Sequence, residues 1–166
     1  MTINKTLSGF HSVSHDRPLL EQSIDAYRMK GKLPEPTVCP KCNAVFHEGR
    51  WQWGVAPMVA HHEICPACQR QEDDFPAGYV TLNGPFLSEH SDEILRLIYN
   101  KEEHERAEHP LKRIMAVEKK GDSLLVTTTD IHLARGIGEA VHHAYQGELE
   151  LQYNAGENLL RAYWNR

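Results

Sequence analysis

The sequence predicts an α+β protein made of two unlike parts, and three observations predict it. All four cysteines lie in two Cys-x-x-Cys pairs. A stretch with two prolines, Leu33–Thr37, precedes them and disfavours helix. Beyond these pairs, segments with a strand pattern alternate with segments with a helix pattern. We therefore divide the chain into an N-terminal arm with a short helix (1–36), a cysteine module (37–76), an α/β domain (77–154) and a C-terminal tail (155–166).

The arm begins with a polar segment, residues 1–15, which we expect to be flexible. A helix is expected to begin after Asp16, a suitable N-cap, and to end at Gly31. Its apolar residues recur at i, i+4 and i+7, as on the buried face of a helix: Leu20, Ile24 and Tyr27.

The cysteine module contains two knuckles of the form Cys-Pro-x-Cys, separated by 22 residues. The pairs are Cys39 with Cys42 and Cys65 with Cys68. Two residues between cysteines allow one tight turn to direct both sulfurs at the same ion, and two such turns complete a tetrahedral shell. Between the knuckles, Glu48-Gly49 is flanked by aromatic and β-branched residues, which predicts a hairpin. The module therefore reads as a zinc ribbon with one structural Zn²⁺.

Three other uses of Cys-x-x-Cys pairs can be compared with a zinc site: haem attachment, an iron site and a redox disulfide. Haem attachment needs a histidine directly after the second cysteine, but Asn43 and Gln69 stand there. A mononuclear iron site of the rubredoxin type uses similar knuckles, which do not distinguish it from a zinc site. A thioredoxin-like redox disulfide needs one Cys-x-x-Cys pair in a βαβ context, which is absent around both pairs. His61 and His62 could replace a ligand, but four cysteines already fill the shell. A closed shell of four thiolates is structural, because it leaves no position for a catalytic water.

The α/β domain is expected to have the order βαββαβ, as in a ferredoxin-like fold. The predicted strands are 78–82, 114–118, 123–129 and 148–153. The predicted helices begin at the N-caps Ser91 and Asp130 and end at Pro110 and Gly147. The tail reads as a docking helix, because its apolar residues fall at i, i+1, i+4 and i+5.

Charge and hydropathy exclude some classes of protein. The net charge is −5, and residues 89–108 hold seven acids and three bases, a balance of −4 that leaves −1 for the remainder. This permits a local basic face without favouring nucleic-acid binding. No apolar run is long enough for a signal peptide or a membrane span, so we expect a cytoplasmic protein.

Six residues are candidates for contact with RNA or a protein partner, because arginine pairs with phosphate and aromatic rings stack on bases. They are Arg50, Trp51, Trp53, Arg135, Arg161 and Arg166. At least one tryptophan of the module is expected to pack in it instead. An enzyme using Asp130 and His132 is a weaker reading, because Asp130 is explained as a helix cap and no nucleophile is placed beside it.

Five segments together resemble a family of small bacterial zinc-ribbon proteins from about Asp25 onward. They are VCPKCNAVFHEGRWQW, CPACQRQEDDFPAGYV, HPLKRIMAVE, TTTDIHLARGIGEAVHHAY and RAYWNR. That family is similar to the N-terminal half of the archaeal and eukaryotic adaptor for export of the large ribosomal subunit, which has more CxxC pairs than this chain. The resemblance implies no enzymatic activity, and it implies association with the ribosome or ribosomal RNA through the six residues above.

Our first hypothesis is a non-enzymatic zinc-binding protein that associates with the ribosome or structured RNA, as a stress or hibernation-type factor. Docking on a ribosomal protein would suit the acidic total better than docking on RNA. The alternative is a protein–protein regulatory adaptor whose zinc module is purely structural. Neither hypothesis includes a small-molecule substrate or a membrane.

Overall fold

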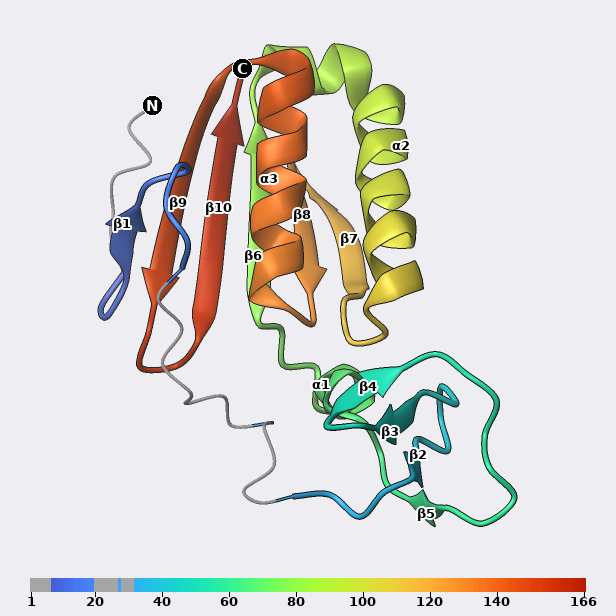
Figure 1. The fold of residues 1–166 in the computed structure, drawn as a ribbon. Coiled ribbons are helices and arrows are strands. Elements are labelled where there is room, and N and C mark those ends of the chain that lie inside the picture. The colour runs from blue at the N-terminus through green and yellow to red at the C-terminus, as the bar shows by residue number, and fades with distance from the viewer. Residues whose placement is uncertain (1–6, 20–26, 28–31) are drawn as a thin grey trace.

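The computed structural model describes residues 7–19, 27 and 32–166. Figure 1 shows a two-layer α/β domain and, below it, a small ribbon. The large sheet has the order β1-β9-β10-β6-β8-β7. Its strands are β1 (His11–Val13), β6 (Gly78–Asn83), β7 (Ile114–Lys120), β8 (Ser123–Thr128), β9 (Glu148–Asn154) and β10 (Leu159–Asn165).

Two helices, α2 (Pro85–Glu108) and α3 (Ile131–Tyr145), pack side by side on one face of this sheet (Figure 1). The core between the layers is apolar, and side chains such as Val80, Ile98 and Ile137 have no exposed surface. The α3 helix lies close to β6 at Gly78, where a Cβ would stand 2.3 Å from the Cβ of Ala134. Among the described residues, none of the helices combines the length and apolarity that a membrane crossing needs.

The tail is a strand, so its prediction as a docking helix was wrong. Strand β10 runs antiparallel to β9 and parallel to β6, with Ala162 opposite both Leu151 and Val80. The apolar residues of the tail fit the period of a strand as well as that of a helix, because they also occur at alternate positions. Leu160, Ala162 and Trp164, which alternate in this way, are fully buried. The edges of β9 and β6 both need backbone partners, and β10 supplies them.

The ferredoxin-like order is therefore not confirmed. In that arrangement the last strand, β9, would pair directly with β6. Here β10 lies between them, and the mixed sheet has six strands. The four predicted strands and the two predicted helices of the βαββαβ pattern are nevertheless present. Helix α2 begins earlier than predicted, after Gly84, and is kinked at His90, directly before the expected cap Ser91.

The N-terminal arm contributes to the large sheet. Strand β1 pairs with β9 along the segment that the sequence assigned to a flexible arm, so that expectation was wrong for residues 11–13. The expected helix falls mainly on residues 20–26 and 28–31, which lie outside the described residues. Residues 17–19, at its expected start, are not helical.

The ribbon is a four-stranded sheet of order β4-β3-β2-β5, followed by helix α1 (Pro66–Asp73). Its strands are β2 (Thr37–Val38), β3 (Val45–His47), β4 (Arg50–Gln52) and β5 (His61–His62). The predicted hairpin is confirmed: β3 and β4 pair around Glu48 and Gly49, which have φ of 51° and 78°. Two consecutive positive φ angles are typical of the tight turn that matches strand twist.

Candidate metal centre

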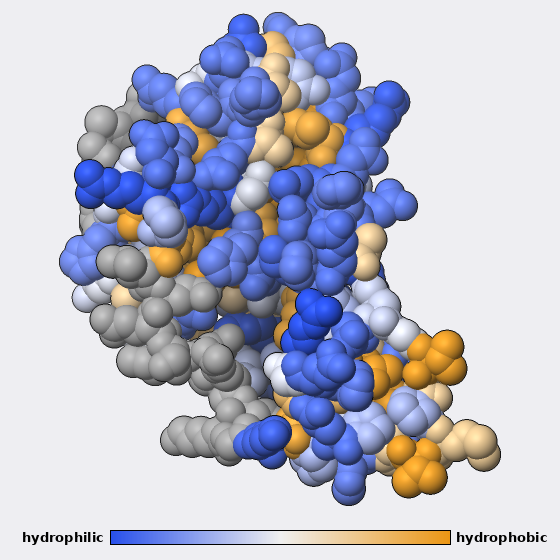
Figure 2. Space-filling model, viewed as in Figure 1, coloured by the Kyte–Doolittle hydropathy of each residue, from blue (hydrophilic) through white to orange (hydrophobic). Residues whose placement is uncertain are grey.

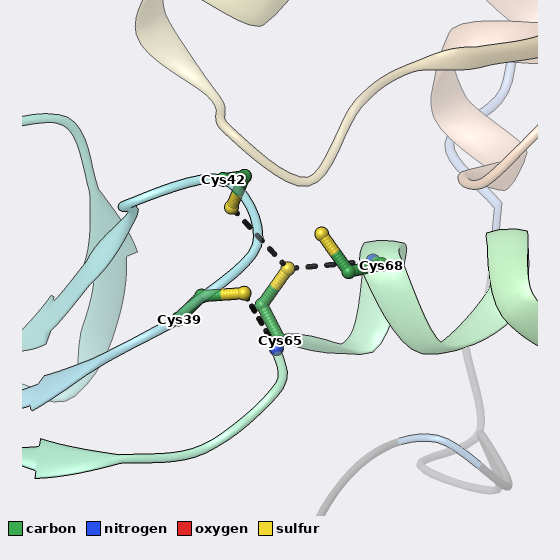
Figure 3. A group of neighbouring side chains, drawn as sticks. All are labelled: Cys39, Cys42, Cys65 and Cys68. Carbon is green, nitrogen blue, oxygen red and sulfur yellow. Dashed lines mark hydrogen bonds between the residues drawn. The ribbon is translucent and has the colours of Figure 1, made fainter.

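The first knuckle follows strand β2. The backbone N–H of Cys39 donates to the carbonyl of Ala44, and the N–H of Asn43 donates to the carbonyl of Cys39, each at 2.9 Å. These bonds close a tight turn, and Asn43 takes the left-handed conformation there, with φ of 65°. The turn directs the sulfurs of Cys39 and Cys42 to the same side of the ribbon (Figure 3).

The second knuckle is the beginning of helix α1. Cys65 is the N-cap, and its sulfur accepts a hydrogen bond from the backbone N–H of Cys68 at 3.4 Å. Pro66 occupies the first helical position, where no backbone donor is needed. The two sulfurs face those of the first knuckle (Figure 3).

The four cysteines form one cluster with the dimensions of a metal site. Their sulfurs all lie within 4.8 Å of one another, none is in a disulfide, and those of Cys42 and Cys65 are 3.8 Å apart. A tetrahedron with Zn–S bonds of about 2.3 Å has edges of about 3.8 Å. The donor set therefore fits a single metal ion, as the sequence predicted, and a shell of this kind suits zinc or iron.

Because the cysteine sulfurs are largely buried, their negatively charged thiolate forms need a nearby positive charge. Three of the cysteines are buried and Cys42 is half-buried. Burial raises the pKa of Cys65, and the neighbouring charges of Cys42 and Cys39 raise it further, against the N–H of Cys68 and the guanidinium of Arg113. Burial likewise raises the pKa of Cys68. For Cys39, backbone hydrogen bonds outweigh burial and lower the pKa to about 7. Four thiolates can coexist here when a bound cation compensates their charge.

Arg113 is the residue of the site that sequence reasoning missed. It comes from the turn between α2 and β7, which passes over the cluster as the pale yellow loop in Figure 3. The guanidinium donates to the sulfurs of Cys68 at 3.1 Å and Cys65 at 3.7 Å. It is held by the carbonyl of Pro110 at 2.8 Å and the side chain of Gln71 at 3.2 Å.

This arginine connects the ribbon to the α/β domain. Its side chain is buried, and its backbone pairs with Thr129 at the end of β8. Leu111 of the same turn packs against the cysteine cluster with Trp51. No local pattern marks Arg113, because one basic residue before a strand is ordinary. Only the folded chain brings it to sulfurs more than 40 positions away.

The six predicted partner residues do not gather on one described element. On the ribbon, Arg50 is exposed, whereas Trp51 packs edge-to-face on Phe46. Trp53 is exposed, and its indole N–H donates to the carbonyl of Arg106 at 2.7 Å. One module tryptophan is thus structural, as expected.

The other three arginines make contacts within the chain. Arg135 pairs with Glu139 at 2.8 Å and also donates to the carbonyl of His15. The guanidinium of Arg161 lies 4.5 Å from the ring centroid of Tyr79. That of Arg166 lies 4.2 Å from the centroid of Phe86.

Asp130, His61 and His62 lie outside the predicted partner-binding set. The Asp130 side chain accepts from the backbone N–H of Leu133 at 2.9 Å, so its prediction as the cap of α3 is confirmed. His61 and His62 form strand β5 and are exposed, outside the four-cysteine cluster.

Comparison of the chain with models of protein families, with curated proteins and with solved structures found no match.

Proposed function

We propose that this chain is a non-enzymatic zinc-binding adaptor whose ribbon holds one structural Zn²⁺ and docks on a protein partner. The closed four-cysteine shell supports the structural role, because it leaves no open position for substrate or water. The ribbon has few buried apolar residues outside this cluster, so the metal would hold the docking surface in shape.

The observation that carries the proposal is an exposed apolar loop, residues 53–60, between β4 and β5. Val55 is 96% exposed, Val59 is 87% exposed and Met58 is fully exposed. Figure 2 shows orange side chains on the ribbon, at the lower right, where Figure 1 draws this loop. Contiguous apolar surface of this kind on a protein surface marks a site of interaction, because leaving it in water is unfavourable.

We place the partner on the ribosome, as the family resemblance implies, and favour a ribosomal protein over ribosomal RNA. Arg135, Arg161 and Arg166 already contact carbonyls, a carboxylate or aromatic rings of their own chain. The acidic helix α2 would repel a phosphate backbone. Apolar surface, in contrast, matches the fully buried centre of a protein interface.

The test is ribosome co-sedimentation at low and high salt with three forms of the chain: wild type, the double variant Val55→Ser/Met58→Ser, and Arg50→Ala. We expect the double variant to lose most of the co-sedimentation and Arg50→Ala to retain it at both salt concentrations. Loss with Arg50→Ala alone, together with strong salt dependence, would favour RNA and overturn the protein-docking proposal. Absence of co-sedimentation by the wild type would remove the ribosome as the partner.

A further inference from the structure

A cleft of about 510 Å³ lies beside the apolar loop, between the ribbon and the last turns of α2. Its aromatic residues are Trp53 from the loop and Tyr99 from α2, which are 37% and 48% exposed. The hydrogen bond from the Trp53 indole to the carbonyl of Arg106 fixes the loop against the helix. The cleft and the apolar loop therefore form one continuous surface.

Two carboxylates line this cleft, Glu102 and Glu103. Oε1 of Glu102 accepts from the backbone N–H of Ile114 at 2.9 Å, which holds this carboxylate in place. Glu103 is exposed, and Arg106 is the one basic residue among those lining the cleft. The charged residues that line the cleft, Glu102, Glu103 and Arg106, carry a net charge of −1.

We infer that this cleft binds a lysine or arginine side chain of the partner, from a basic segment whose apolar neighbours pack on the loop 53–60. The inference rests on the proposed function and specifies its partner. Aromatic rings and carboxylates together are the surroundings that a cationic side chain prefers, because both attract its charge. Extended basic arms are a common feature of nucleic-acid-binding proteins, which fits a protein component of the ribosome.

Other occupants suit this surface less well. A second copy of the chain, docked symmetrically through this patch, would bring two acidic α2 helices together. RNA and anionic membranes would meet the same acidic helix, and both carry negative charge at their surfaces. A basic and apolar peptide satisfies the charge and the apolar area together.

The experiment measures binding of fluorescein-labelled peptides by anisotropy, using the full zinc-loaded chain. The first peptide alternates lysine and leucine, the second has glutamate in place of lysine, and the third has serine in place of leucine. We expect binding of the first peptide alone, and a roughly tenfold loss of its affinity with Glu103→Lys. The matched control is Glu89→Lys, an exposed acid of α2 outside the cleft, for which we expect little change. Far-UV circular dichroism would show that both variants are folded.

The outcomes separate this inference from the proposed function. Equal affinity of wild type and Glu103→Lys for the first peptide would overturn the cleft, as would binding of a fluorescein-labelled single-stranded RNA oligonucleotide, without peptide, that Glu103→Lys strengthens. If the Val55→Ser/Met58→Ser variant still abolished ribosome co-sedimentation, the docking proposal would stand without the cleft. Dimerisation of the wild-type chain that the same double variant abolishes would identify a second copy as the occupant and overturn the inference.

Discussion

Replacing Arg113 by methionine removes the guanidinium from the metal site but keeps a long, unbranched side chain. Arg113 is only 3% exposed, and it donates to two of the four sulfurs. A shell of four thiolates around a divalent cation carries two net negative charges, and Arg113 is the cation that contacts the shell from the α/β domain. We expect the variant to bind zinc more weakly.

The magnitude follows from the contacts that are lost. Hydrogen bonds to charged groups contribute about 1.5–3 kcal/mol each, but removing the arginine also removes the cost of burying its own charge. Partners of metal ligands typically account for about 10–100-fold in metal affinity. We therefore expect zinc affinity to fall by about 10–100-fold, which is about 1.4–2.8 kcal/mol.

The assay is competition for zinc between the protein and a chromogenic chelator at constant pH. Arg96→Met is the matched control, because Arg96 is exposed on α2. Arg113→Lys should fall between wild type and Arg113→Met, since it keeps the charge but not the planar donor fork. An affinity for Arg113→Met within twofold of the control would refute the reasoning.

The remaining predictions concern the ribbon, an ion pair and one glycine. Cys68→Ser should lose the metal and the ordered ribbon but keep most of the far-UV helix signal, because the large core does not use the cysteines; cooperative loss of all structure would contradict this. Burial raises the pKa of Glu105, but hydrogen bonds from Lys112 and Lys101 outweigh burial and lower this pKa below its usual value of 4.5. Its contribution to stability is therefore present above pH 4.5 and lost as the pH falls through the lowered pKa. Glu105→Gln should cost about 1 kcal/mol at pH 7 in urea unfolding, and this cost should shrink as the pH is lowered through the acid range. Gly78→Ala should cost about 1–3 kcal/mol in the same assay, because its Cβ would overlap α3, whereas Gly54→Ala, with open space around it, should cost less than about 0.5 kcal/mol.

The features that the sequence predicted correctly depend on contacts between near neighbours in the chain. Asp130 bonds to a backbone N–H three residues later, and the turn at Glu48 and Gly49 needs only two positive φ angles. Each knuckle is likewise set by a few consecutive residues, 39–44 in the first and 65–68 in the second. Short-range geometry of this kind can be read from spacing and residue type alone.

The tail shows where local pattern was insufficient. Its apolar residues fit a helix period and a strand period equally, and the choice depended on two distant strands, β9 and β6, whose edges it joins. Local pattern also did not show which of the two ribbon tryptophans packs inside the module. Trp51 packs at the cysteine cluster and Trp53 faces α2, and the side of the ribbon that meets the α/β domain decides between these positions.

Spacing and residue type alone predicted the four clustered cysteines, most of the helices and strands, and the acidic character of α2. Tertiary structure decided the central position of β10, the contact of Arg113 with the sulfurs, and the exposure of the loop 53–60 beside an acidic cleft. The physical reason is range. Ligand spacing and capping act over a few residues, whereas strand order, burial of a charge and the docking of two modules depend on segments that meet only when the whole chain is folded.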